Sequence, residues 1–274
     1  PPTAAAAAAL AASSGGGGGG GEVATFTDAD FKFAAMPPGA YAKPGANVDV
    51  QRNATELFGE APTVYVSRAA LLSRATCKGA IEAAEVWAAA HGGWTTARHY
   101  TVATTDVPMT SLPALLPQFN EALRTQLFPA LASRYPDAAP DPAGLRVLDA
   151  FLVKYHAGAQ ASLPLHSDQS ILSFTIALND PAEYEGGGTW FRGLGMAIDA
   201  AAAGHVVMFP GKLEHAGHPI TSGTRYVIVL FCGYDSNLSG RPNGWVMQRF
   251  VELGGKYDGG APAADARRPE KDEL

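Results

Sequence analysis

The feature that most constrains the fold is a series of short β-type segments in the second half of the chain. They are rich in β-branched and aromatic residues, and glycine or proline separates them. They cover residues 145–155, 171–178, 189–191, 205–209 and 225–233. Several short strands at this spacing are typical of a β-sandwich or jelly roll. We therefore predict a mainly β domain of the α+β class, a double-stranded β-helix (jelly roll, cupin-like) with flanking helices.

Two helical patterns precede these segments and predict an N-terminal helical support. Residues 63–66 have the composition of a short strand, and Ser67 is a candidate N-cap for a helix over about 68–90. The side chains expected on the apolar face of this helix are Leu72, Ala75, Ile81, Val86 and Trp87. A second helix is expected over about 112–135, with Pro117 and Pro129 limiting its continuity.

Changes of composition divide the 274-residue chain into three parts. Residues 1–60 begin with an alanine-rich run followed by seven glycines, a composition that cannot bury a core. Residues 61–235 hold the helical and β patterns and form the expected single domain. Residues 236–274 are polar and rich in glycine and proline, and we expect a C-terminal extension there.

Residue types that bind metals lie within the β-rich part. His166 and Asp168 form a His-x-Asp pair, and His215 and Arg225 follow, ten residues apart. Two histidines and one carboxylate on one face of a metal are the triad of non-haem Fe(II) oxygenases, which leaves coordination positions open. A guanidinium beside them matches the carboxylate of a dicarboxylate cosubstrate. Each residue alone has an ordinary structural explanation, but together they predict an iron site.

The expected local geometry follows from strand periodicity. On one extended strand, His166 and Asp168 would point the same way, while Ser167 would face away. Residues 221–223, Thr-Ser-Gly, have turn composition. A turn there would fold the Arg225 strand antiparallel onto the His215 segment. The sequence thus predicts that His215 and Arg225 lie on neighbouring strands facing one cavity.

Four sequence segments carry a family resemblance. They read FLVKYHAGAQASLPLHSD, FTIALN, YEGGGTWF and GHVVMFPGKLEHAGHPITSGTRYVIVLF. With them the chain resembles the 2-oxoglutarate/Fe(II) dioxygenases, and most closely the catalytic domain of procollagen lysyl hydroxylases. A weaker likeness upstream extends the resemblance to roughly residues 62–235.

The resemblance implies a role for each matching residue. It makes His166, Asp168 and His215 the iron ligands. It implies that Arg225 pairs with the distal carboxylate of 2-oxoglutarate, that Tyr155 contacts this cosubstrate and that Thr175 lines its pocket. O₂ would be the second cosubstrate, and dependence on L-ascorbate is expected.

The segment HAGHP contains two histidines that residue type alone cannot distinguish. The interval to Arg225 and the proline after the pair match the family pattern at His215. His218 then becomes a residue of the pocket rim or of the solvated surface. The four remaining candidates lack ligand spacing, and we interpret them as structural; they are His91, His99, His156 and His205.

These observations predict a dioxygenase that hydroxylates a polypeptide side chain in the manner of a lysyl hydroxylase. Two alternatives remain open from the sequence. One is a prolyl 4-hydroxylase type of activity, because the target residue is selected by pocket walls that the motifs do not define. The other is a catalytically silent jelly-roll binding module, because a fold by itself does not determine function.

Composition and the chain end indicate location and partners. The net charge is −6 and no lysine- or arginine-rich stripe is present, so nucleic acid is not an expected partner. No apolar run approaches the ~20 residues of a membrane span. The last four residues are KDEL, an address read by the ER retrieval receptor, and we expect the ER lumen. Two glycosylation sequons begin at Asn53 and Asn237.

The chain has two cysteines, Cys77 and Cys232. An oxidising compartment would permit a disulfide between them. Buried free thiols are the other interpretation. The sequence leaves both open.

Overall fold

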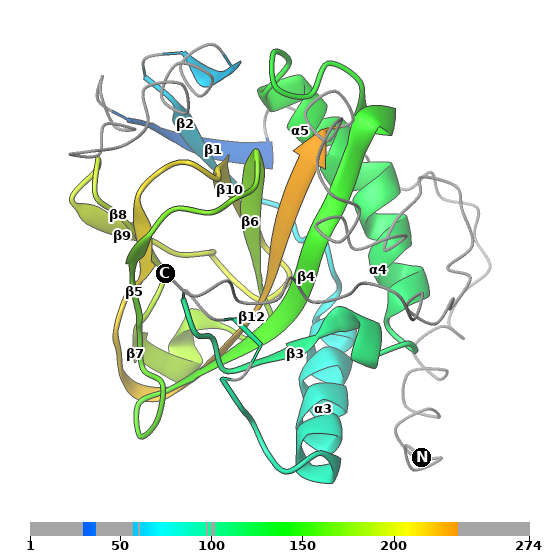
Figure 1. Cartoon of the computed structure of the whole chain (residues 1–274), viewed down its shortest axis with the longest axis vertical. Coiled ribbons are helices and arrows are strands. Elements are labelled where there is room, and N and C mark those ends of the chain that lie inside the picture. Colours follow the sequence, from blue (N-terminus) through cyan, green and yellow to red (C-terminus); the bar gives the residue numbers. More distant parts are fainter. Residues whose placement is uncertain (1–29, 37–56, 60, 97, 100–101, 235–274) are drawn as a thin grey trace, which may run out of the picture.

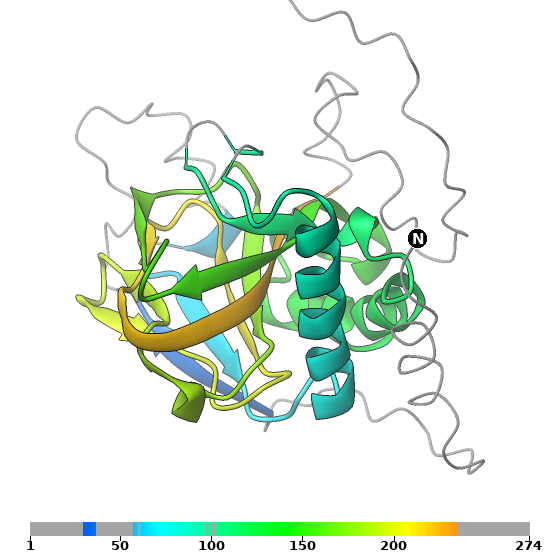
Figure 2. The same ribbon diagram turned by 90° about the horizontal axis from the view of Figure 1, so that it is seen from below.

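The computed structural model describes residues 30–36, 57–59, 61–96, 98–99 and 102–234. Two antiparallel sheets face each other, and helices cover the outer side of the larger one (Figures 1 and 2). The larger sheet contains β1 (Phe31–Ala35), β2 (Thr63–Ser67), β3 (Asp106–Pro108), β4 (Leu145–His156), β6 (Leu172–Ala177), β7 (Tyr184–Gly186), β10 (Val206–Pro210) and β12 (Ile220–Tyr234). The smaller sheet contains β5 (Leu163–His166), β8 (Thr189–Phe191), β9 (Met196–Ile198) and β11 (His215–Gly217).

The chain alternates between the two sheets along its β-rich part. The larger sheet has the order β1-β2-β10-β6-β12-β4-β3 with β7 paired to β12, and the smaller has β5-β11-β8-β9. Strands β4, β6, β10 and β12 therefore belong to one sheet, while the strands between them in sequence belong to the other. This is the arrangement of a jelly roll. The predicted mainly β fold with flanking helices is confirmed.

The alternation of side chains along the strands separates a core face from a cavity face. Leu152, Ile176 and Ile228 point away from the smaller sheet and pack with the helices in the main core. Their neighbours Phe151 and Thr175 point to the opposite face and line a cavity between the sheets. The helices thus stabilise the back of the larger sheet and leave its front face for a site.

Helix α3 (Arg74–Ala90) begins later than the sequence suggested. Its N-cap is Ser73, whose hydroxyl accepts a hydrogen bond from the Thr76 backbone N–H at 3.0 Å. Ser67, the predicted cap, is instead the last residue of β2. The buried side of the helix is formed by Cys77, Ala80, Ala84 and Ala88.

The predicted apolar face of α3 was therefore wrong. Val86 is 42% exposed, and Ala75 is also exposed. The buried positions carry small side chains, which let the helix approach the large side chains of the sheet closely. A pattern weighted toward large apolar residues misses such a face.

The second helical region is divided as its prolines predict. It consists of α4 (Leu116–Ala122), a π-helical turn (Leu123–Leu127) and α5 (Phe128–Arg134). Pro129 has no N–H to donate to the preceding turn, and the wider turn lies directly before it. Short 3₁₀ turns occur at Met109–Ser111, Pro142–Gly144 and Pro181–Glu183.

Several predictions concern residues outside the described ranges, including both sequons, the C-terminal extension and the KDEL end. Strand β1 precedes the expected domain start at residue 61, yet it pairs along its length with β2. Cys77 and Cys232 are both buried and free. Among the described residues, no helix is long and apolar enough to cross a membrane.

Candidate functional site

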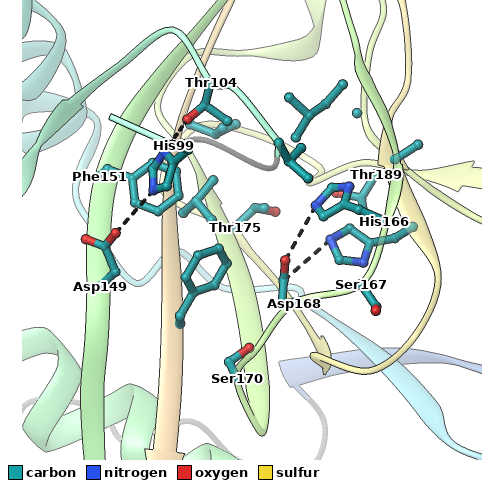
Figure 3. Close-up of a pocket in the computed structure, with 18 of the residues that line it drawn as sticks. His99, Thr104, Asp149, Phe151, His166, Ser167, Asp168, Ser170, Thr175 and Thr189 are labelled. Carbon is teal, nitrogen blue, oxygen red and sulfur yellow. Dashed lines mark hydrogen bonds and ion pairs between the residues drawn. The ribbon is translucent and has the colours of Figure 1, made fainter. Parts of the chain in front are cut away.

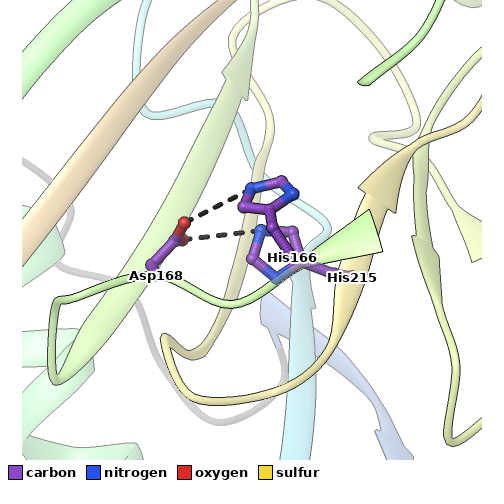
Figure 4. A group of neighbouring side chains, drawn as sticks. All are labelled: His166, Asp168 and His215. Carbon is purple, nitrogen blue, oxygen red and sulfur yellow. Dashed lines mark ion pairs between the residues drawn. The ribbon is translucent and has the colours of Figure 1, made fainter. Parts of the chain in front are cut away.

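Three side chains singled out by the sequence lie together in the space between the sheets (Figure 4). The ligand atoms of His166, Asp168 and His215 all lie within 4.8 Å of one another. Asp168 Oδ1 is 3.4 Å from His166 Nε2, and Asp168 Oδ2 is 3.5 Å from His215 Nε2. Three potential donor atoms thus converge on one small volume.

Backbone carbonyl groups fix the orientation of both imidazole rings. His166 Nδ1 lies 2.8 Å from the Pro164 carbonyl oxygen, and His215 Nδ1 lies 2.9 Å from that of Leu213. A carbonyl oxygen only accepts hydrogen bonds, so each Nδ1 is the protonated nitrogen. Each neutral ring then presents its Nε2 lone pair toward Asp168. Outer hydrogen bonds of this kind set the tautomer of histidines that bind metals.

Asp168 is buried and its charge is supported on several sides. Its Oδ2 accepts a hydrogen bond of 2.5 Å from Ser173, whose hydroxyl also lies 2.6 Å from that of Ser170. Burial alone would raise the pKa of Asp168. The neighbouring His215 and His166, together with the Ser173 hydrogen bond, outweigh burial and hold that pKa below its usual value. Asp168 is therefore an ionised carboxylate at neutral pH.

The His-x-Asp pair does not lie on one strand, contrary to expectation. His166 is the last residue of β5, and Asp168 follows in the loop after it. The Asp168 backbone N–H donates to the Gly211 carbonyl at 2.7 Å, which holds this loop against the end of β10. A Cβ at Gly211 would lie 2.6 Å from the Ser170 carbonyl oxygen, so this close approach requires glycine.

The predicted pairing of the His215 and Arg225 segments was wrong. His215 lies on β11 opposite His166, in the smaller sheet. Arg225 lies on β12 opposite Tyr155, in the larger sheet. Residues 221–223 are not a turn but part of β12, which bends at Gly223 with a φ of 76°. His215 and Arg225 consequently line one cavity from opposite sheets instead of from neighbouring strands.

That cavity has a volume of about 510 Å³ and contains the whole predicted set (Figure 3). The triad lies on one side of it. Tyr155, Thr175 and Arg225 also line it. His218 does not: its backbone N–H donates to the Gly188 carbonyl at 3.0 Å, and the converging group contains His215.

Arg225 is deeply buried, with 4% of its surface exposed. One terminal nitrogen, Nη2, lies 3.2 Å from Asp199 Oδ1, and the guanidinium carbon lies 5.7 Å from the centre of the Tyr155 ring. Burial alone would lower the pKa of Arg225, but Asp199 and Tyr184 raise it, so the charge is retained. The buried Nε makes no hydrogen bond within the described part of the chain. An unmatched buried donor is suited to an incoming acceptor.

A second polar cluster lines the same cavity on the side away from the triad (Figure 3). The two ring nitrogens of His99 lie 3.0 Å from an Asp106 oxygen and 3.3 Å from an Asp149 oxygen. Arg98 contacts the same two carboxylates at 2.7 Å and 3.1 Å. Burial would lower the pKa of His99, but its hydrogen bonds to Asp106 and Asp149 raise it to about 9. This histidine is therefore an imidazolium at neutral pH.

Some residues of the site carried no recognisable signal in the sequence. Asp199 follows β9 in an alanine-rich segment, and nothing local marks it as a partner of Arg225. Ser173 is one of several serines near the His-x-Asp pair. His99 was interpreted as structural, and its contacts agree with that, although it also faces the cavity.

The sequence comparisons identify relatives of this chain. No family model matches it. It is 32% identical over 153 residues to the human multifunctional procollagen lysine hydroxylase and glycosyltransferase LH3, covering 52% of this chain and 20% of that protein. It is 44% identical over 85 residues to rat procollagen-lysine,2-oxoglutarate 5-dioxygenase 1, covering 30% of this chain and 12% of the relative. The chain is related to the procollagen lysyl hydroxylases. It matches no more than about a fifth of the length of these relatives.

Solved structures with similar coordinates include two oxygenase-type proteins of low identity. The viral collagen prolyl hydroxylase of Paramecium Bursaria Chlorella virus-1 aligns with a TM-score of 0.44 and 17% identity, covering 62% of this chain and 94% of that one. AviO1 from Streptomyces viridochromogenes Tue57 aligns with a TM-score of 0.46 and 15% identity, covering 73% and 99%.

Proposed function

We propose that this protein is a 2-oxoglutarate- and Fe(II)-dependent dioxygenase that hydroxylates a polypeptide side chain. The observation that carries the proposal is the convergence of His166, Asp168 and His215 in one cavity, opposite the buried Arg225. The relationship to procollagen lysyl hydroxylases supports it independently.

The three converging side chains suit Fe(II). They provide two imidazole nitrogens and one carboxylate, the donor set of non-haem iron oxygenases. Both imidazoles are held in the tautomer whose Nε2 is unprotonated, and the carboxylate is ionised. None of the three needs to lose a proton at neutral pH before it binds a cation. Three ligands on one side would leave room for a chelating cosubstrate and O₂.

Arg225 suits the distal carboxylate of 2-oxoglutarate. Its charge is buried, its Nε lacks an acceptor among the described residues, and it lines the same cavity as the triad. Tyr155 stacks near its guanidinium and Thr175 lies on the adjacent strand β6, so both would contact the same molecule. When bound, iron with 2-oxoglutarate and O₂ supplies the oxidation that converts a C–H bond to C–OH, with release of succinate and CO₂.

The protein's own contribution would be binding, orientation and exclusion of water. Asp168 and the two histidines fix the position of the metal. Arg225 fixes the far end of the cosubstrate, and therefore the direction from which it approaches. The apolar side chains of Phe151, Val229 and Phe231 line the cavity between the triad and the His99 cluster, where they would keep the reacting carbon away from bulk water.

The finer calls belong to the same proposal. A lysyl side chain of a polypeptide is the proposed target, because the relatives are named for procollagen lysine. The ER lumen is the proposed location and the retrieval receptor a proposed partner, because the sequence ends in KDEL. L-Ascorbate is proposed as a reductant that maintains Fe(II), on the family resemblance.

A turnover assay tests the proposal. The purified protein is loaded with Fe(II) and given 2-oxoglutarate, ascorbate and a library of lysine- and proline-containing peptides. Succinate release and a peptide mass gain of one oxygen are followed, with His215→Ala as the inactive control. We expect hydroxylated lysine. Hydroxyproline instead would transfer the assignment to prolyl hydroxylation, and no succinate with any peptide would favour a silent binding module.

A further inference from the structure

Asp199 stands beside the proposed cosubstrate site and has no role in the function described so far. It follows strand β9 and is held by three donors. Its Oδ1 accepts from the Ala200 backbone N–H at 2.9 Å and from Arg225 Nη2 at 3.2 Å, and its Oδ2 accepts from the Tyr184 hydroxyl at 2.8 Å. A carboxylate with three separate donors is fixed in place and in turn fixes what it contacts.

The same contacts restrict Arg225 from two sides. The Tyr155 ring lies on one side of the guanidinium, with a centroid distance of 5.7 Å, and Asp199 engages Nη2 on another. Arginine has many rotamers, and binding a carboxylate through its planar fork requires one of them. With Nη2 anchored, the buried Nε remains without an acceptor among the residues that the structure describes. The arrangement therefore leaves an N–H of a positioned guanidinium for a ligand.

Two glycines make room for this arrangement. Gly187 has a φ of 78°, and a Cβ there would lie 3.0 Å from both Arg225 Cδ and Tyr184 Cε2. Gly188 has a φ of 89°, and a Cβ there would lie 3.3 Å from Asp199 Cβ. The glycine run after β7 thus permits Tyr184, Asp199 and Arg225 to meet.

We propose that Asp199, held by Tyr184, is a positioning residue that sets the affinity of the site for the distal carboxylate of the cosubstrate by fixing Arg225. The inference rests on the proposed function, since it assumes that Arg225 receives that carboxylate. A simple charge argument predicts the opposite effect. Asp199 is itself negative and would repel a ligand carboxylate, so its removal would tighten binding if it acted only as a neighbouring charge. The direction of the change therefore separates positioning from repulsion.

Equilibrium binding to the Mn(II)-loaded protein tests the inference without requiring turnover. Calorimetry measures the Kd of 2-oxoglutarate and of 2-oxopentanoate, which has a methyl group in place of the distal carboxylate. For 2-oxoglutarate we expect the Kd to rise about tenfold in Asp199→Ala, the loss of roughly one charge-assisted hydrogen bond. Asp199→Asn keeps an acceptor oxygen, and Tyr184→Phe removes only one donor, so about threefold is expected for each. The Kd of 2-oxopentanoate should stay unchanged in all of them.

Controls separate the outcomes. Asp137→Ala removes an exposed aspartate that does not line the cavity, and it should change neither Kd. Melting temperature and Mn(II) stoichiometry check that each variant is folded, and if Asp199→Ala does not fold, Asp199→Asn and Tyr184→Phe carry the test. An unchanged or lower Kd for 2-oxoglutarate would overturn the inference. Arg225→Ala is the reference: if it also leaves the Kd unchanged, the proposed cosubstrate site itself is wrong.

Discussion

The two polar clusters of the cavity contain the same residue types and differ in how their histidines are paired. In the triad, each histidine directs Nδ1 to a backbone carbonyl and Nε2 toward Asp168. In the other cluster, both ring nitrogens of His99 are engaged by carboxylates. A metal requires an unprotonated nitrogen, which the first arrangement provides and the second does not. Ring orientation, rather than the presence of histidine and aspartate, thus distinguishes the proposed metal site from a structural ion-pair cluster.

Charge balance separates the two clusters as well. Asp106 and Asp149 are matched by Arg98 and the His99 imidazolium, so that cluster is neutral in itself. In the triad, neutral imidazoles surround one ionised carboxylate, which leaves a net negative charge in a buried place. A buried charge is stable only when it is paired or binds a cation. The first cluster satisfies this rule alone, whereas the second is suited to a metal.

The largest expected effect is the loss of a triad residue. His166→Ala, Asp168→Ala and His215→Ala should each reduce 2-oxoglutarate turnover to background, because each removes one of three protein ligands. Succinate release measured with saturating Fe(II) checks this. His99→Ala is the matched comparison from the other cluster and should retain bound metal. Turnover near the wild-type level in any triad variant would contradict the division between the clusters.

The next largest effect concerns Arg225. Arg225→Ala should raise the apparent KM for 2-oxoglutarate about thirtyfold or more, because removing one partner of a buried charge pair costs roughly 2–5 kcal/mol. Arg225→Lys keeps the charge but loses the fork, so a smaller rise is expected. Iron content, measured in parallel, should stay at the wild-type level in both. Loss of iron together with affinity would show that Arg225 supports the metal site instead.

The His99 cluster should appear in the pH dependence of stability. The pKa of His99 is raised to about 9 from a model value of 6.5. A raised folded-state pKa stabilises the fold fully below about pH 6.5, and this stabilisation is lost as the pH rises through about 9. The contribution is at most about 3 kcal/mol by the rule of 1.36 kcal/mol per pKa unit. Urea unfolding between pH 6 and 10 should show this loss in the wild type and a flatter profile in His99→Gln.

The smallest expected effect distinguishes the two histidines of HAGHP. His218 donates its backbone N–H to Gly188 and lies outside the converging group. His218→Ala should therefore retain turnover within about twofold of the wild type, which corresponds to less than ~0.5 kcal/mol. Steady-state kinetics beside His215→Ala measures the contrast. An inactive His218→Ala with an active His215→Ala would show that the ligand assignment has the wrong register.

What the sequence predicted well rests on local signals. The β segments are marked by β-branched residues between glycines and prolines, and four of the five expected runs match strands to within about a residue at each end, while β12 begins five residues earlier than expected, at Ile220. The triad was identifiable because its residue types and order are unusual in combination. Both kinds of signal lie in the residues themselves and do not depend on which strands pair.

What the sequence did not predict depends on long-range pairing and on small residues. The segment at residues 221–223 has turn composition, but pairing with β7 incorporates it into β12. His215 was therefore assigned to the wrong neighbour. The buried face of α3 consists of alanines and a cysteine, which a hydrophobic pattern cannot distinguish from exposed alanines. Asp199 meets Arg225 only through the fold, since 26 residues separate them in sequence.

Metal stoichiometry across the two clusters tests the central claim most directly. Mn(II) binding is titrated by calorimetry at pH 7 into wild type, His166→Ala and His99→Ala, all prepared free of metal. The account predicts one Mn(II) per chain in the wild type and in His99→Ala, and greatly weakened or no binding in His166→Ala. Unchanged binding in His166→Ala, or its loss in His99→Ala with the fold intact, would contradict the assignment of the metal site to the triad.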